Sequence, residues 1–265
     1  MIIRSLLNGL GIAFIFLCVS AAADTYTITF DETGLHSPTA SENWGTIIDN
    51  EYGSDNLINY AGIDVTFWAQ TSQSDFSNSN NFSSNNANLF LTLFNSDATF
   101  STEDPDLIVG QGNLAVIHER NHECSLANNR CNDPDDRYRS GSPHGGFVFI
   151  NFSQAVNLHS IGLADIESGS NQRGKIRFYN SAGATVQNAG SNWTMMDVTG
   201  NKGYTTQEFN FASNITYMVL RMQGSGGFKN LTFSSTNVVP EPSSFLIFLM
   251  SLALLYFGHH RKNAS

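Results

Sequence analysis

The sequence predicts an all-β protein, an antiparallel β-sandwich or jelly roll, flanked by an N-terminal signal peptide and a C-terminal membrane helix. Runs of β-branched and aromatic residues recur along the chain, and clusters of Gly, Asn, Ser, Asp or Pro separate them. Only 14% of the residues are charged, a composition that favours strands and polar turns over long helices. The expected strands cover 26–30, 63–69, 89–93, 147–152, 175–179, 208–211 and 215–220.

These strands are expected to form one domain, residues 24–237. The chain has 265 residues, of which 41% are hydrophobic, and that is enough for an ordinary packed core. No Pro- or Gly-rich linker divides the domain. Residues 71–88 contain six Ser and six Asn in 18 positions, which predicts a long exposed loop.

The charge balance excludes one class of function. The chain carries 13 Lys and Arg against 23 Asp and Glu, a formal net charge of −10. A surface this acidic repels phosphate backbones, so nucleic-acid binding is excluded as the main function.

The N-terminus has the pattern of a secretory signal peptide, residues 1–23. Arg4 precedes an apolar run, and Ala21, Ala22 and Ala23 stand before Asp24. Small residues at the last and third-last positions fit cleavage after Ala23. We therefore expect an exported protein that begins at Asp24.

The C-terminal segment, residues 238–265, combines three features in order. Pro240, Glu241 and Pro242 precede a short apolar stretch, expected to span the membrane at 244–258, and a basic cluster follows. This tripartite pattern resembles the PEP-CTERM sorting signal of Gram-negative bacteria. The resemblance implies processing by exosortase, a membrane-embedded cysteine peptidase, and a final place at the cell surface or in an exopolysaccharide or biofilm matrix. A plain linker before a membrane anchor is the alternative.

The domain itself is similar to the β-sandwich bodies of exported PEP-CTERM proteins and of related calcium-dependent, carbohydrate-module-like domains. The residues that carry this similarity are short and loosely spaced, and they include 29–31, 104–107, 112–117, 134–136, 161–167 and 224–227. The similarity implies a sandwich fold and, more weakly, a calcium ion.

Two cysteines remain once the signal peptide is removed. Cys124 and Cys131 are separated by six residues, and in an oxidising compartment two cysteines this close most simply form one disulfide. The chain-entropy estimate for a loop of about eight residues is about 2.5 kcal/mol. This disulfide is expected to stabilise one loop rather than the whole fold.

The segment from His118 to His122 reads H-E-x-x-H, the pattern in which two histidines of one helix bind zinc and Glu119 activates a water. The context differs from a zinc peptidase, because Arg120 stands where such helices carry an apolar residue. Residues 114–117 read equally well as a strand that runs into a polar loop. We therefore expect neither peptidase activity nor stoichiometric zinc.

Acidic residues cluster in the expected turns, and calcium favours six to eight oxygen ligands of this kind. Asp165 and Glu167 are two positions apart, so on a strand their carboxylates share one face. The alternative is a solvated acidic rim. The predicted calcium ligands are Asp31, Asp104, Asp106, Asp165 and Glu167.

Three functions follow from these patterns. The leading hypothesis is a non-enzymatic envelope or matrix protein, sorted by exosortase and associated with polysaccharide. A secreted zinc hydrolase that uses His118, Glu119 and His122 is the second. The third is a carbohydrate-binding module in which Trp44, Trp68 or Trp193 stacks on sugar rings, although such aromatic residues more often belong to a core.

Overall fold

Every regular element in the described part of the chain is a β-strand. The computed structural model describes residues 23–32, 45–48, 52, 60, 62–70, 89–97, 105–118, 124–125, 127–132, 145–168, 174–186, 193–210, 212–222 and 226–236. The strands are β1 (Thr25–Ile28), β2 (Val65–Gln70), β3 (Leu91–Asn95), β4 (Asn113–Ile117), β5 (Cys124–Ser125), β6 (Arg130–Cys131), β7 (Gly146–Ala164), β8 (Lys175–Tyr179), β9 (Thr194–Met195), β10 (Tyr204–Glu208), β11 (Ile215–Met222) and β12 (Gly227–Ser235). The predicted all-β class is confirmed.

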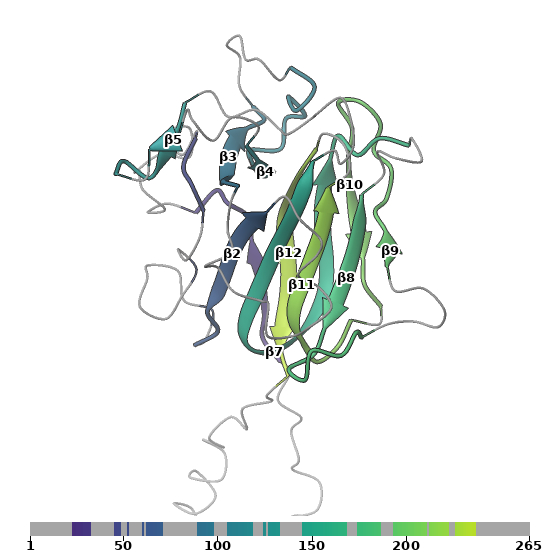
Figure 1. Ribbon diagram of the computed structural model, residues 1–265. Coiled ribbons are helices and arrows are strands. Elements are labelled where there is room, and N and C mark those ends of the chain that lie inside the picture. The colour runs from purple at the N-terminus through teal and green to yellow at the C-terminus, as the bar shows by residue number, and fades with distance from the viewer. Residues whose placement is uncertain are drawn as a thin grey trace, which may run out of the picture. The chain divides into compact units, whose positions relative to one another are not determined.

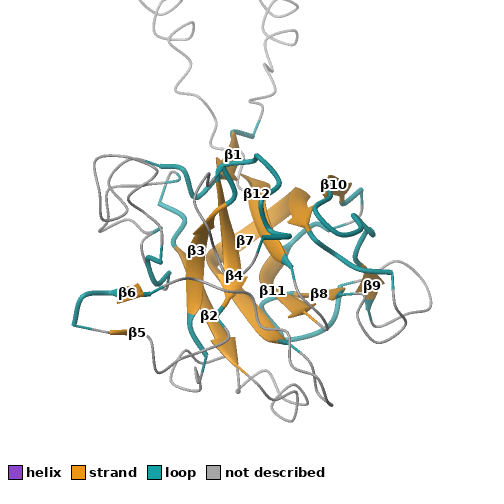
Figure 2. Ribbon diagram, turned by 90° about the horizontal axis from the view of Figure 1, so that it is seen from above, coloured by secondary structure: helices purple, strands orange, loops and turns teal. Residues whose placement is uncertain are grey.

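Ten of these strands form one curled antiparallel sheet, and β7 organises it (Figure 1). The first half of β7 pairs with β2 and β11, whereas its second half pairs with β10 and β12. Strands β8 and β9 continue the sheet beyond β11, and β4 and β3 continue it beyond β12. Figure 2 shows the resulting curvature from above.

The main core lies where the two halves of the curled sheet face each other. The ring of Phe30 is 5.7 Å from Phe67 of β2 and 5.7 Å from Phe228 of β12, so it joins both halves. Phe152 of β7 packs against Phe233 of β12 at 5.3 Å in the same way. This packing across an apolar interior is what a β-sandwich requires.

One predicted strand is misplaced. A strand was expected at 208–211, but β10 covers Tyr204–Glu208, so the observed strand begins four residues earlier. The backbone N–H of Phe209 donates to the carbonyl of His159, and its ring lies 5.1 Å from Phe178 in the core. The bond to His159 continues the β10–β7 register by one pair, and Phe209 is buried between the exposed Glu208 and Asn210, so the alternation persists past the end of β10.

The compact unit that contains the sheet spans Asp24–Thr236, one residue short of the domain expected from the sequence. The predicted signal peptide, the 71–88 loop, the sorting motif and the 244–258 span lie outside the described residues. Within the described ranges no helix is long and apolar enough to cross a membrane.

Candidate functional site

The sheet has two apolar faces, and the second of them is the candidate site. Side chains on alternate positions of β2, β7, β8 and β11 point into the main core. The positions between them form the opposite face, called here the outer face. Three rows cross it from β2 through β7 and β11 to β8: Thr66, Asn151, Tyr217, Tyr179; Trp68, Phe149, Val219, Arg177; and Gln70, Phe147, Arg221, Lys175.

The β2 end of the outer face is closed. Trp68 is only 5% exposed and stacks on Phe149, with ring centroids 5.1 Å apart and planes 7° apart. Two donors at this end, Trp68 Nε1 and Gln70 Nε2, are buried and have no hydrogen-bond acceptor among the described residues. Antiparallel sheets usually solvate a face that is not part of the core, so a buried aromatic layer here is unusual.

The other end of the outer face, at β8 and β9, is more open. Trp193 immediately precedes β9 and is partly buried against the aromatic layer. The guanidinium of Arg177 lies 4.1 Å from the centroid of the Trp193 ring and donates to the hydroxyl of Tyr179 at 3.2 Å. Met195 pairs with Lys175 in register and is 37% exposed. An indole fixed by a guanidinium thus lies at the accessible edge.

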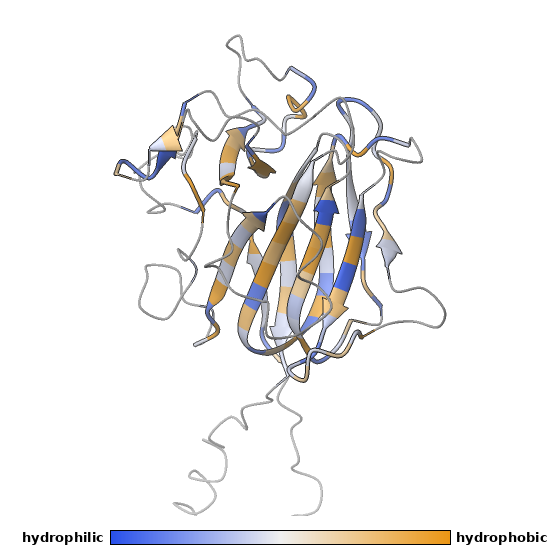
Figure 3. Ribbon diagram, in the orientation of Figure 1, coloured by the Kyte–Doolittle hydropathy of each residue, from blue (hydrophilic) through white to orange (hydrophobic). Residues whose placement is uncertain are grey.

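Positive charge gathers at the same end. Lys175 and Arg221 are directly opposite each other on neighbouring strands, and Arg177 follows two positions further along β8. Arg221 also lies 5.8 Å from the ring centroid of Phe147. Figure 3 shows hydrophilic bands on β8 and β11 between hydrophobic ones. The outer face therefore offers aromatic rings and cationic donors together.

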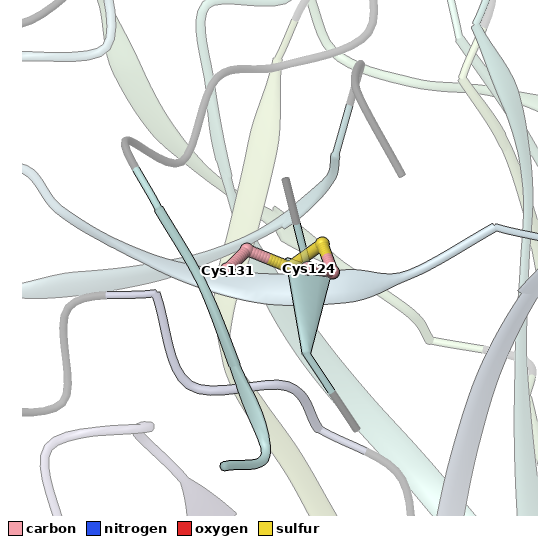
Figure 4. Close-up of a disulfide and its surroundings, with 2 residues drawn as sticks. All are labelled: Cys124 and Cys131. Atoms are coloured by element: carbon pink, nitrogen blue, oxygen red, sulfur yellow. A yellow bond between two sulfur atoms is a disulfide. The ribbon is translucent and has the colours of Figure 1, made fainter. Parts of the chain in front are cut away.

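The predicted disulfide is present. Cys124 and Cys131 face each other in the short β5–β6 ladder and are bonded (Figure 4). The backbone N–H of Cys131 donates to the carbonyl of Gly45 at 2.7 Å, which ties this hairpin to another loop. The bridge belongs to a peripheral two-stranded ladder, in agreement with a local role.

His118, the first residue of the H-E-x-x-H pattern, has extended backbone. It lies directly after β4, its backbone forms a β-bridge, and its N–H donates to the carbonyl of Phe90 at 2.8 Å. Of the two readings left open for 114–117, the strand is the one observed, in β4, while 119–122 lie outside the described residues.

A ligand atom of His118 lies within 4.8 Å of both Cys124 and Cys131. Because metals bind thiolates and these two sulfurs are joined in a disulfide, the trio is not a metal site in this oxidised form.

The carboxylate of Asp31 is held by protein groups. Lys229 Nζ donates to Oδ2 at 2.8 Å, and the backbone N–H of Asn113 donates to Oδ1 at 2.8 Å. Lys229, which is itself buried, also donates to the carbonyl of Gln111. A Cβ at Gly112 would lie only 2.7 Å from Asp31 Oδ1, so glycine is needed there for the close approach. Asp31 thus neutralises a buried lysine.

The other predicted calcium ligands are dispersed. The premise that Asp165 and Glu167 share a strand is wrong, because β7 ends at Ala164 and Asp165 has a φ of 53°. Asp165 is buried and accepts a hydrogen bond from the backbone N–H of Lys202 at 3.1 Å.

Asp106 lies in a turn, half-buried, and Asp104 is outside the described residues. No three carboxylates of the described chain bring oxygens within 4.8 Å of one another. Calcium binding therefore stays a prediction from sequence.

We did not predict from the sequence that the side chains of the outer face form one apolar surface outside the main core. The signal was present, because apolar or aromatic residues occupy both parities of 147–150 and of 217–220, which marks strands buried on both faces. The pairing register that aligns Lys175 with Arg221 follows only from the fold.

No protein-family model and no curated protein matches the chain. Among solved structures, a family 32 carbohydrate-binding module from C. perfringens NanJ in complex with galactose is 14% identical, with a TM-score of 0.27, over 71% of this chain and 98% of that one. A mutant of the lectin binding domain of lectinolysin, complexed with Lewis b, is 12% identical, with a TM-score of 0.24, over 35% of this chain. The match covers 66% of that domain, slightly under two thirds. Similarity at this level does not define a shared fold.

Proposed function

We propose that this protein is an exported, non-enzymatic β-sandwich that binds glycan through the open end of its outer face. The observation that carries the proposal is the placement of Trp193, held by Arg177 at 4.1 Å, beside two paired tyrosines of β8 and β11. Sugar rings present apolar C–H faces, which stack on aromatic rings, and hydroxyls, which need hydrogen-bond partners. Trp193, Tyr217 and Arg177, which are each only partly buried, supply both kinds of contact.

The fixed orientation of the indole strengthens this proposal. A ring that is held before binding loses little conformational entropy when a ligand stacks on it. Trp193 lies under the Arg177 guanidinium, which is itself bonded to the Tyr179 hydroxyl. The three side chains therefore form a preorganised set at the sheet edge rather than isolated surface groups.

Export and sorting are part of the same proposal. They are supported by the signal-peptide pattern of residues 1–23 and by Pro240, Glu241 and Pro242 ahead of the apolar stretch. The Cys124–Cys131 disulfide also fits an oxidising compartment. We propose that exosortase processes a membrane-anchored precursor and that the mature protein reaches the surface or extracellular matrix of a Gram-negative bacterium. There it associates with polysaccharide.

A secreted zinc hydrolase is the competing function. The extended backbone at His118 favours the non-enzymatic proposal, because the H-E-x-x-H pattern needs both histidines on one helix. Tight zinc at one equivalent, lost in His118→Ala, would favour the hydrolase.

The glycan proposal is tested with the exported, disulfide-bonded protein on an array of bacterial polysaccharides. Replacement of an aromatic platform residue should weaken binding strongly, so Trp193→Ala is expected to lose at least about ten-fold in affinity. Val198→Ala is the matched control, because Val198 is the more exposed of the two large exposed apolar side chains of the described chain. Equal binding by Trp193→Ala and Val198→Ala would contradict the site. A folded protein that binds no polysaccharide would contradict the function.

A further inference from the structure

Three of the chain's 13 basic residues meet on a small part of the outer face. Lys175 of β8 pairs directly with Arg221 of β11, and Arg177 lies on the same face two positions away. Like charges directly opposite each other on a sheet are destabilising. In a chain of net charge −10, acidic partners are abundant, so an arrangement that places cations together needs an explanation.

Ion pairing does not provide that explanation for two of the three cations. Across the described ranges, neither Lys175 nor Arg221 forms an ion pair, and the ion pair found there joins Lys229 to Asp31 on another part of the sheet. The buried lysine is thus matched to a carboxylate, whereas the half-buried pair on the outer face is not. Within the part of the chain that the structure describes, Lys175 and Arg221 are therefore available to bind an anion from outside.

The surroundings of the pair indicate the kind of anion. Arg221 lies near the Phe147 ring, and Arg177 contacts Trp193 and Tyr179. Lys175 lies beside Met195 at the exposed edge. An anion alone needs no aromatic neighbours, whereas a charged sugar residue presents a carboxylate to the cations and a ring face to the indole.

We infer that the open end of the outer face binds acidic polysaccharide, with Lys175 and Arg221 as the carboxylate contacts and Trp193 as the stacking platform. This inference rests on the glycan-binding function proposed above and names its ligand class. A polymer with one carboxylate on some or all of its sugar rings fits the two opposed cations, Lys175 and Arg221. Nucleic acid carries a charge about every 1.7 Å of duplex, and the net charge of the whole chain repels such a density.

The geometry also orients the ligand. The closed β2 end, where Trp68 and Phe149 stack, prevents access from that side, so the saccharide must approach over β8 and β9. Because Lys175 and Arg221 are only half-buried, dissolved ions can screen their charge. Binding of the acidic saccharide should therefore weaken as the salt concentration rises.

The test is calorimetric titration of the exported protein with oligogalacturonate and with the same oligomer after methyl esterification, which removes the charge and keeps the rings. The free acid should bind about ten-fold or more tightly than the ester, and its affinity should fall as salt rises. Lys175→Gln and Arg221→Gln should each lose most of this preference and retain binding to the ester. Lys202→Gln, at an exposed lysine in the turn before β10, should keep it.

The failures are distinguishable. Equal binding of acid and ester, unchanged in Lys175→Gln and Arg221→Gln, would overturn the acidic ligand and leave glycan binding intact. Binding of neither saccharide by protein with native thermal unfolding would overturn both proposals. Tighter binding of an oligonucleotide than of oligogalacturonate would also overturn the inference. Melting temperatures of all variants separate loss of binding from loss of fold.

Discussion

The inner and outer faces of the same strands differ in how much apolar surface they bury and in how their charged side chains are paired. On the inner face, strands β2, β7, β8 and β11 supply the main core, and the buried Lys229 elsewhere in the sheet is paired with Asp31 at 2.8 Å. On the outer face the same strands carry a smaller aromatic layer, beside which Lys175 and Arg221 are opposed without an ion pair in the described chain. The paired Lys229 belongs to stability, whereas the two half-buried, opposed cations are the ones that we propose for recognition. We expect substitutions on the two faces to separate in the same way.

The largest effect is expected on the inner face. Leu220 is fully buried in the main core, so Leu220→Ala should lower the free energy of unfolding by about 2–5 kcal/mol. Its neighbour Arg221 points to the outer face, and Arg221→Ala should cost less than about 1 kcal/mol. Urea unfolding of both variants measures the contrast. Equal losses would show that the two faces contribute alike to stability.

A somewhat smaller effect is expected at the paired charge. Lys229→Met keeps the apolar stem and removes the ammonium that Asp31 and the Gln111 carbonyl share. The Asp31 side chain is 34% exposed and keeps the Asn113 N–H, so the loss should be about 2–3 kcal/mol, below that of a fully buried pair. Thermal unfolding checks this, and an unchanged melting temperature would mean that the pair contributes nothing.

The disulfide should contribute comparably but locally. Removal of the Cys124–Cys131 bridge by Cys124→Ser and Cys131→Ser should cost about 2.5 kcal/mol, a shift of about 5–10 °C. Because β5 and β6 form a separate small ladder, glycan affinity should not change. Loss of glycan binding in the double variant would place the site near this hairpin instead.

The smallest stability effect is expected on the outer face. Lys175→Gln removes one of two directly opposed cations, so it should leave stability unchanged or raise it by at most about 1 kcal/mol. The same variant should lose preference for acidic glycan. Destabilisation by 2 kcal/mol or more would show instead that Lys175 supports the fold.

Much of the fold could be predicted from sequence because it depends on local pattern. The 175–179 strand was predicted with its observed bounds, and the 124–131 disulfide followed from the spacing of the two cysteines and the expected oxidising compartment. The strand expected at 208–211 shows the limit, because β10 begins at Tyr204, where its partner is Ala164 of β7, 40 residues away in the sequence. Asp31 was predicted as a calcium ligand from its place in an acidic cluster, and the sequence does not reveal that Lys229, 198 residues away, lies beside it.

The candidate site was less predictable for a related reason. The sequence indicates Trp193 as a possible sugar platform, but the orientation of its ring depends on the contact with Arg177. That contact forms only because β8 and β9 pair. The opposition of Lys175 and Arg221 likewise arises from strand register between segments more than 40 residues apart. The sequence shows which residue types are present, whereas only the strand pairing of the folded sheet shows that they lie together on one face.

Oxidative footprinting with and without oligogalacturonate tests most directly whether the outer face is a binding surface. Met195 and Trp193 are reactive toward hydroxyl radicals and lie at its open end, whereas Tyr204 of β10 lies off this face and serves as the internal reference. The ligand should slow oxidation of Met195 and Trp193 several-fold and leave Tyr204 unchanged. Unchanged oxidation of Met195 and Trp193 at saturating ligand, with or without protection elsewhere, would contradict a glycan site on this face.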